Sequence, residues 1–318
     1  MSDPTRPAPA DGRLDAAVRI AFGLTGGAAK RAIHSGKISV RGQRVVDPGA
    51  SVQAGDPLRL DMNAPRPVRT EPLGVRLVYR DPHILVVDKP SGLLSAPIAG
   101  QSEPTALDGA IALCRGPRVA KVVHRLDKLT SGLMVFARSI VAARGLRAII
   151  DEHRARRVYF CVVQGIPRIP EATIVSDLLR DRGDGYRGSL DGLRQILPYD
   201  APTPPAGELG RQGVTRYRTV ATSPERAALE VRIETGRTHQ IRIHLSEIGH
   251  PVLGDQVYGR NAGAPRQALH AGRLTLPHPN TGEELHFESP WPADLRAVGP
   301  RGPDWLPAPA RSRRPKQR

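Results

Sequence analysis

The chain has 318 residues, which is enough for two domains or for one large domain with a small appendage. Lys and Arg number 47 against 31 Asp and Glu, and the formal net charge of +16 favours a polyanionic partner, nucleic acid above all. No run of eighteen apolar residues and no apolar signal segment occurs, so we expect a cytoplasmic protein that does not cross a membrane. The two cysteines, Cys114 and Cys161, lack the spacing of a zinc site and fit a reducing compartment.

Five segments follow one another along the chain. Residues 1–12 predict a disordered lead, and residues 13–60 predict a small domain of two short helices and a β-hairpin. Three prolines in residues 61–74 indicate a linker. Residues 75–297 predict a large domain, because they contain the longest succession of regular patterns, and residues 298–318 predict a basic, disordered tail.

The large domain is expected to contain more strands than helices. Runs of β-forming residues predict strands at 75–79, 84–88, 157–164, 215–220 and 227–233. Ser139 is expected to cap a helix that runs to about Arg154, and Thr238 to start a helix that runs through Glu247. Because no regular βαβ rhythm appears, the predicted fold class is α+β, with a mostly antiparallel central sheet and flanking helices. Residues 181–212 are rich in Gly and Pro and predict an exposed excursion.

The small domain is basic and has an ordered series of turn residues. Gly36 fits a helix C-terminal cap, and Gly42 fits a tight hairpin turn. This layout resembles the S4 RNA-binding domain, a small α/β unit, although Thr25-Gly-Gly-Ala-Ala29 stands where such domains often carry a Ser-Arg-Ser-like helix start. The resemblance implies phosphate contacts from one basic face, made of Lys30, Arg31, Lys37, Arg41 and Arg44.

Two polar strings in the large domain carry most of the functional signal. Val123-His-Arg-Leu-Asp-Lys-Leu-Thr-Ser-Gly-Leu133 is a polar cluster between apolar runs, where catalytic groups tend to lie. Taken alone, its His124 and Asp127 fit a structural hydrogen-bonded pair equally well. Ile233-Glu-Thr-Gly-Arg-Thr-His-Gln-Ile-Arg-Ile-His244 places Gly-Arg-Thr at a strand-to-helix corner and Arg242 about one turn into the helix. Further polar strings occupy residues 87–94, 249–255, 269–274 and 287–292.

In this order, from about Val75 to Asp294, the strings resemble the RluA-type family of RNA pseudouridine synthases. The resemblance implies an isomerase that acts on uridine in structured RNA without a cofactor or a metal ion. Such an enzyme breaks the N1–C1′ bond, rotates the base and joins C5 to C1′. The resemblance also implies that Asp127 is the catalytic aspartate, that Arg242 pairs with it, and that Tyr159 lies beside the uracil ring. Asp127 could attack C1′ or remove a sugar proton, and both routes stay open.

The RNA contacts are expected around this catalytic group, on a basic cleft with Asp127 on its floor. A uridine inside folded RNA must be turned out before C1′ is reachable. Arg125 and His124 are candidate RNA contacts, and Arg125 could fill the vacated stack or grip a phosphate. Backbone amides at a helix start could bind phosphate or order the loop, which adds four candidates: Arg237, Thr238, His239 and Gln240.

The substrate and two rival functions stay open at this stage. An S4-like domain in front of the synthase favours large-subunit ribosomal RNA, with transfer RNA as the alternative, and we expect a monomer. A non-catalytic RNA-binding protein with a synthase-like core is a second alternative. A metal-dependent hydrolase is disfavoured because no HExxH motif joins His239, His244, His250 or His270.

Overall fold

The computed structural model describes residues 5–64, 72–98, 103–114, 120–181, 186–189, 194–205, 210–259 and 263–300. The chain divides into two compact units, of which the first takes the residues up to Leu73 together with 96–112. The second unit takes residues 74–95 and the chain from Leu113 onward. Within the described ranges, no helix combines the length and the apolar character that a membrane crossing requires. The roles predicted from the sequence for residues 13–60 in RNA binding, 61–74 as a linker and 75–297 in catalysis stay predictions.

The first unit contains the two helices and the hairpin predicted for residues 13–60. Its elements in chain order are β1 (Thr5–Pro7), β2 (Gly12–Arg13), α1 (Leu14–Phe22), α2 (Gly26–His34), β3 (Ile38–Val40), β4 (Gln43–Arg44), β5 (Ser51–Val52) and β6 (Pro57–Leu60). Arg41 and Gly42 both have positive φ, 52° and 80°, as a tight turn between β3 and β4 requires. Leu14, Ile33 and Leu58 are fully buried and join the helices to the small sheet. Helix α3 (Ala106–Leu113) ends at a boundary between the units.

The prediction of a disordered lead is wrong for residues 5–12. Strand β1 pairs antiparallel with β6, and Ala8 is buried in the core of the unit. Pro7 is tolerated because β1 is an edge strand, where a missing N–H costs no ladder hydrogen bond. At the other end of the chain, Val298 is buried and its carbonyl accepts from Arg226 Nη1, so the second unit continues past residue 297. Residues 1–4 and 301–318 lie outside the described residues.

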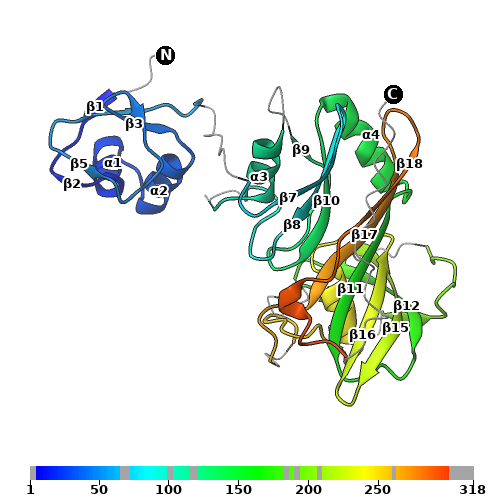
Figure 1. Ribbon diagram of the computed structural model, residues 1–318. Helices are drawn as coiled ribbons and strands as arrows, with labels where there is room; N and C mark the ends of the chain where they lie inside the picture. The colour runs from blue at the N-terminus through cyan, green and yellow to red at the C-terminus, as the bar shows by residue number, and fades with distance from the viewer. Residues whose placement is uncertain are drawn as a thin grey trace. The chain divides into compact units, whose positions relative to one another are not determined.

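The second unit is built on one large sheet, which has twelve strands in the part of the chain that the structure describes. Its main path runs β13-β12-β15-β16-β11-β17-β10-β8-β7 (Figure 1). Of the pairings between named strands, only β10 with β17 is parallel, which confirms the α+β class with a mostly antiparallel sheet. The strands are β7 (Arg76–Arg80), β8 (Ile84–Lys89), β9 (Lys121–Val122), β10 (Ser131–Ala137), β11 (Arg156–Gln164), β12 (Glu171–Leu179), β13 (Gly188–Ser189), β14 (Gln195–Leu197), β15 (Arg211–Ser223), β16 (Arg226–Ile233), β17 (Leu269–Pro277) and β18 (Glu284–Glu288).

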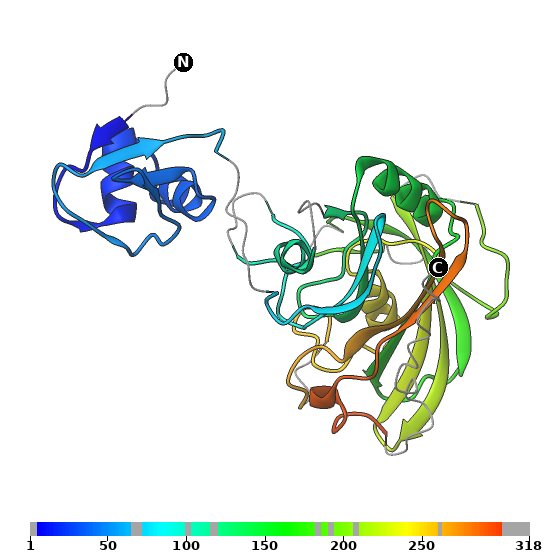
Figure 2. The ribbon, with the colours of Figure 1, turned by 45° about the horizontal axis from the view of Figure 1, so that its top comes forward.

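Helix α4 (Ile140–Asp151) covers one end of this sheet, running beside β10 and β18 (Figures 1 and 2). Ser139 caps it as predicted, since its Oγ accepts from Ala142 N at 3.0 Å. The apolar side of α4 packs Leu146 and its neighbours against β8 and β10. The helix ends before the predicted Arg154 because His153 has a left-handed φ of 56°.

Helix α5 (Gln240–Glu247) follows β16 and packs on β15. It begins two residues later than predicted because His239 is left-handed, with φ 60°. The Gly-Arg-Thr corner between β16 and α5 is where the sequence placed it. A short 3₁₀ turn, Ala293–Leu295, lies near the end of the described chain.

The prediction that residues 181–212 form an exposed excursion is only partly right. The described parts contain β13 and β14, and both pair with β12. Ser189 is buried, and its backbone N–H donates to Glu247 at 2.7 Å. Strand β12 itself was not predicted; its buried Ser176 finds a partner in His244, at 3.0 Å between Oγ and Nε2.

Candidate active site

Asp127 lies in the loop that enters β10, beside the parallel pairing of β10 with β17. Gly132 pairs with Ala271 there and has a φ of 114°. A Cβ built on Gly132 would lie 2.3 Å from the Ala271 carbonyl oxygen, so only glycine allows this close approach. The Thr-Ser-Gly part of the first polar string therefore joins the two strands and sets the position of Asp127.

Buried hydrogen bonds hold the Asp127 loop from below. Leu126 N donates to Ser95 Oγ at 2.9 Å, and Ser95 Oγ donates back to Leu126 O at 2.6 Å. Lys89 is fully buried, and burial lowers its pKa to about 7. Its Nζ donates at 2.8–3.1 Å to three carbonyl oxygens, those of Pro90, Leu93 and Lys128. Lys89 thus ties the backbone on either side of the loop together.

Arg242 links Asp127 to a second carboxylate, Asp255. Arg242 Nη1 donates to Asp127 Oδ2 at 3.0 Å, while Nε and Nη2 donate to the two oxygens of Asp255 at 2.6 and 2.9 Å. The Asp127 side chain is 23% exposed and that of Asp255 is 0% exposed. Burial of Asp255 raises the pKa of its carboxyl, but the hydrogen bonds and charge of Arg242 lower it by more. The pKa of Asp255 therefore lies below its ordinary value. The bidentate pair fixes the guanidinium so that one N–H points to the exposed carboxylate.

Tyr258 and His239 complete the surroundings of this arginine. The Arg242 guanidinium carbon lies 5.1 Å from the centre of the Tyr258 ring. His239 Nδ1 is 2.9 Å from the Tyr258 hydroxyl, and His239 Nε2 is 4.0 Å from Asp127 Oδ2. Burial lowers the pKa of His239, so its ring is neutral near pH 7.

Tyr159, on β11, is the third group near Asp127. It is 6% exposed. Burial raises the pKa of its hydroxyl, and the charge of Asp127 adds to that shift, while Arg157 opposes it. The three residues proposed as catalytic from the sequence, Asp127, Tyr159 and Arg242, therefore come together in the second unit from a loop, a strand and a helix.

Residues 83–247 match the family model described as RNA pseudouridylate synthase. This chain belongs to that family. A relative from Zymomonas mobilis, named ribosomal large subunit pseudouridine synthase D, is 34% identical over 85% of this chain and 86% of its own. A Bacillus subtilis relative, named as an uncharacterized RNA pseudouridine synthase, is 33% identical over 83% of this chain and 84% of its own. The fold matches a solved structure of human RNA pseudouridylate synthase domain containing 1, with TM-score 0.54, 23% identity and coverage of 71% of this chain and 86% of that one. The protein is an RNA pseudouridine synthase, an isomerase.

Two residues that the sequence offered as RNA contacts are used inside the synthase. His124 Nε2 accepts from Val135 N at 3.0 Å, and burial lowers the pKa of His124 to about 3, so it carries no charge for a phosphate. Gln240 is buried: its amide oxygen accepts from Thr235 Oγ1 and Arg237 N, and its amide nitrogen donates to Val214 O. Gln240 therefore orders the loop before α5 instead of facing solvent.

The other contacts predicted in the second unit are more accessible. Arg125 is exposed and, among the described residues, has no hydrogen bond or ion pair. Arg237 is exposed and donates from Nε to Gln212 O at 3.0 Å. Thr238 is half-buried beside it. A Cβ at the preceding residue, Gly236, would lie 2.9 Å from Nη1 of Arg157, so the Arg157 side chain would have to shift to admit one.

The basic residues of the first unit differ in how free their charges are. Lys30 and Arg31 are exposed on α2, although Lys30 Nζ lies 3.7 Å from Asp15 Oδ2. Arg41 is tied to Asp56 by two hydrogen bonds, of 2.7 and 3.1 Å. Lys37 is half-buried and donates to Ala64 O. Arg41 and Lys37 therefore already have hydrogen-bond partners within the first unit, which makes them less available to a phosphate than Lys30 and Arg31.

Sequence reasoning missed Asp255 and Tyr258. The first stands in the polar string at 249–255, which was noticed but given no role, and the second follows it by three residues. An aspartate and a tyrosine close together in a polar string were the available signal. No group of three or more His, Cys, Asp or Glu suited to a metal ion occurs in the described residues.

Proposed function

We propose that this synthase isomerises a uridine of large-subunit ribosomal RNA and that Asp127 is the reacting carboxylate. The observation that supports Asp127 is the 3.0 Å contact from Arg242, whose other nitrogens are held by Asp255. The choice of ribosomal RNA draws on relatives such as the Zymomonas mobilis protein, which is named for the large ribosomal subunit. Transfer RNA is the alternative substrate.

The three side chains can divide the chemistry among them. In one route the carboxylate of Asp127 attacks C1′ as the N1–C1′ bond breaks, and the Asp127–C1′ bond breaks in turn when C5 joins C1′. In the other route Asp127 removes a sugar proton as the N1–C1′ bond breaks, and returns that proton to the sugar when C5 joins C1′. The C5 proton leaves to solvent, and N1 takes up a proton. Arg242 aims the carboxylate. Tyr159 offers a ring face to the uracil and a hydroxyl that keeps its proton near neutral pH, because burial raises its pKa.

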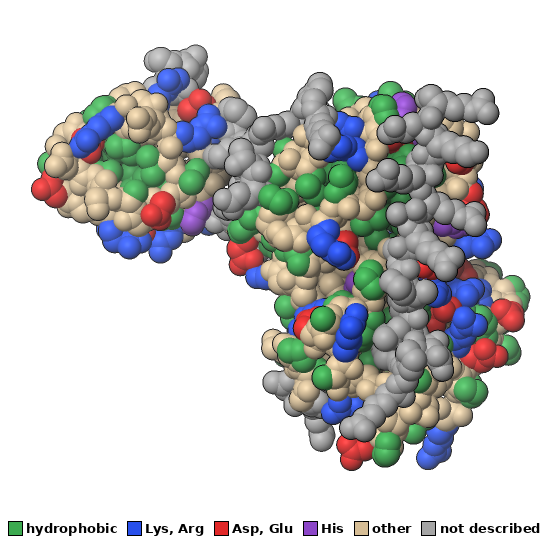
Figure 3. Space-filling model, in the orientation of Figure 1, with side chains coloured by type: hydrophobic (Ala, Val, Ile, Leu, Met, Phe, Trp, Pro, Cys, Tyr) green, Lys and Arg blue, Asp and Glu red, His purple; other side chains and the backbone are tan. Residues whose placement is uncertain are grey.

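The first unit and the net charge supply the sequence-independent part of RNA binding. Lys and Arg side chains are spread over the visible face of both units, with Asp and Glu among them (Figure 3). Lys30 and Arg31 are the exposed cations of the S4-like unit that best suit phosphate contacts. Both cysteines are free and buried, in keeping with a reducing compartment such as the cytoplasm, and we expect the enzyme to act there as a monomer.

Tritium release from [5-³H]uridine-labelled transcripts tests this proposal. Wild type, Asp127→Asn and Asp151→Asn are assayed in parallel on ribosomal and transfer RNA transcripts; Asp151 is exposed at the end of α4 and serves as the control carboxylate. We expect release by wild type and Asp151→Asn from a ribosomal transcript, and none by Asp127→Asn. Release by Asp127→Asn at the wild-type rate would overturn the assignment of Asp127. Release from transfer RNA alone would overturn the choice of substrate.

A further inference from the structure

A pocket of about 220 Å³ lies in the second unit, beside Tyr258. Its apolar walls include Ile243 of α5 and Val257, and two aromatic side chains, Tyr186 and Tyr258, also line it. Ile243 is 1% exposed, whereas Tyr186 is 51% exposed and accessible from solvent. A pocket lined by apolar and aromatic side chains suits a nucleobase, because every base has a flat face that can stack on an aromatic ring.

The pocket shares a wall with the proposed reaction centre. Tyr258 lines the pocket, and the same ring lies 5.1 Å from the guanidinium carbon of Arg242. Arg242 in turn contacts Asp127 at 3.0 Å. The pocket and the proposed reaction centre are therefore linked through Tyr258 and Arg242.

Arg187 supplies a cation at the edge of this pocket. It is half-buried and, among the described residues, makes no hydrogen bond or ion pair. Arg187 lines the pocket together with Tyr258, and the Tyr258 ring lies against Arg242. Glu247 also lines the pocket, but its carboxylate already accepts from Ser189 and from Arg194. A partly desolvated arginine is suited to an anion from the substrate, and a guanidinium matches the geometry of a phosphate.

We propose that this pocket binds the nucleotide next to the target uridine, with its base against Tyr186 and Tyr258 and its phosphate on Arg187. The proposal rests on Asp127 being the reaction centre. The pocket is then a subsite through which the enzyme holds the flanking strand after the uridine has been turned out. Tyr186 and Arg187 immediately precede β13, so the proposal gives these two residues of the predicted excursion a role in substrate binding.

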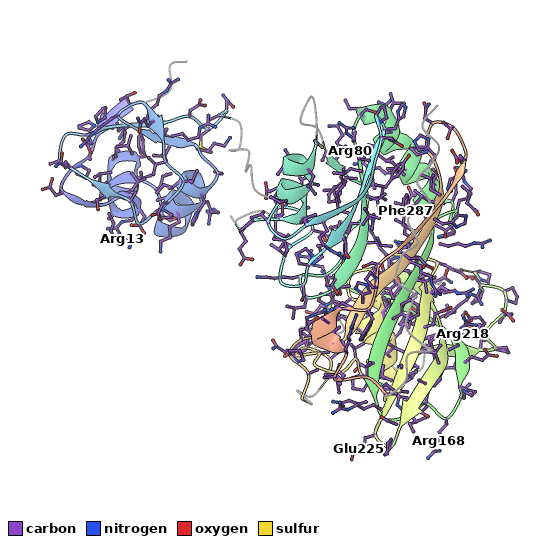
Figure 4. The ribbon with its side chains drawn as sticks, viewed as in Figure 1. Arg13, Arg80, Arg168, Arg218, Glu225 and Phe287 are labelled. Atoms are coloured by element: carbon purple, nitrogen blue, oxygen red, sulfur yellow. The ribbon has the colours of Figure 1, made fainter. Side chains whose placement is uncertain are left out.

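The test combines protein variants with RNA that lacks one base. The ribosomal RNA fragment that wild type modifies is synthesised with an abasic residue immediately before or immediately after the target uridine. Its dissociation constant and single-turnover rate are measured for wild type, Tyr186→Ala and Arg187→Gln. Arg168→Gln is the matched control, because Arg168 is an exposed arginine near Glu225, at the far end of the sheet (Figure 4).

Loss of one stacked base should weaken binding about tenfold. For wild type, we expect one of the two abasic RNAs to bind about tenfold more weakly than the intact RNA. For Tyr186→Ala, the same abasic RNA should bind almost as tightly as the intact RNA, because the variant has already lost the stacking partner. Arg187→Gln should lower the salt dependence of binding by about one phosphate contact, while Arg168→Gln leaves it unchanged. Equal losses for wild type and Tyr186→Ala on both abasic RNAs would overturn the proposal.

Two comparisons keep this result separate from the assignment of Asp127. If Asp127→Asn still releases tritium, the reaction centre lies elsewhere and both proposals fail together. If Asp127→Asn is inactive but neither abasic RNA binds wild type more weakly, only the pocket proposal fails. The second comparison uses unaltered protein, so it decides the matter even if Tyr186→Ala or Arg187→Gln does not fold, which circular dichroism would show.

Discussion

Replacing Asp255 by Asn tests how Arg242 is held. Asp255 Oδ1 accepts from Arg242 Nη2 at 2.9 Å, from Val257 N at 2.9 Å and from Tyr258 N at 3.1 Å, while Oδ2 accepts from Arg242 Nε at 2.6 Å. The carboxamide of Asn has a single acceptor oxygen, so its NH₂ group must face at least one of these donors. The substitution therefore removes the charge that compensates a buried guanidinium and leaves a buried donor unpaired.

The cost follows from the burial of the pair. Removing one partner of a buried ion pair costs about 3–5 kcal/mol, which corresponds to a loss of roughly 10 °C in the melting temperature of a unit of this size. A guanidinium that is free to rotate no longer aims at Asp127, and a misplacement of about 1 Å lowers the rate roughly 10²-fold. Urea unfolding measures the first effect, and single-turnover tritium release at saturating RNA measures the second.

The control is Asp294→Asn, which breaks a similar bidentate pair whose arginine is buried but whose carboxylate is half-exposed. Arg266 donates to the two oxygens of Asp294 at 2.7 and 3.2 Å, but this carboxylate is 49% exposed. We expect a smaller loss of stability and of rate there than in Asp255→Asn, because solvent reaches the Asp294 carboxylate and Arg266 keeps its contacts to Leu129 O and Ser131 Oγ. An Asp255→Asn enzyme as stable and as fast as Asp294→Asn would refute the argument that Asp255 positions Arg242.

Three further predictions concern the scaffold. Gly132→Ala should lower the free energy of unfolding by at least about 3 kcal/mol, because the new Cβ would lie 2.3 Å from Ala271 O. Gly282 also has a positive φ but faces open space, so Gly282→Ala should lower the free energy of unfolding by about 1 kcal/mol. Urea unfolding of the two variants measures the difference. Glu230→Gln should lower the free energy of unfolding by about 2 kcal/mol, because this buried carboxylate lies 3.0–3.4 Å from three half-exposed arginines, Arg218, Arg232 and Arg273. Glu284 belongs to an exposed pair, so Glu284→Gln should leave the melting temperature unchanged. Burial lowers the pKa of His244 to about 3 and that of His270 to about 4, so between pH 6.5 and about 4 the unfolded chain binds more protons and stability falls as pH falls. The two contribute a slope of roughly 2.7 kcal/mol per pH unit, of which His244→Gln should remove half; an unchanged slope in His244→Gln would contradict the burial argument.

Much of the fold could be predicted because its elements carry continuous patterns. The strands β8 and β11 are apolar runs, and α4 has both an apolar side and a capping serine. Errors arose where a single residue decides the backbone path. His153 and His239 both adopt left-handed φ, and nothing in local composition indicates that a histidine will do so. The lead was mistaken because Pro-rich composition also suits an edge strand.

The candidate site was predictable only in part, for a different reason. Asp127 and Arg242 stand in strings whose order resembles a family, Tyr159 stands in the predicted strand at 157–164, and the structure brings the three residues together. The partner that fixes Arg242 could not be identified from spacing, since Asp255 lies in another loop and its role depends on burial and hydrogen bonding. Conversely, Gln240 lies in the same string as Arg242, yet its side chain accepts a hydrogen bond from Arg237 N and holds the loop before α5.

The parallel pairing of β10 with β17 explains why the two carboxylates meet on one arginine. In a parallel pair, the segments that enter the strands arrive at the same end of the sheet. The loop that enters β10 carries Asp127, and the segment between α5 and β17 carries Asp255. Helix α5 packs on β15 and places Arg242 between them. An antiparallel pairing would send these two segments to opposite ends. The close approach that Gly132 permits is therefore what allows one guanidinium to hold a buried and an exposed carboxylate at once.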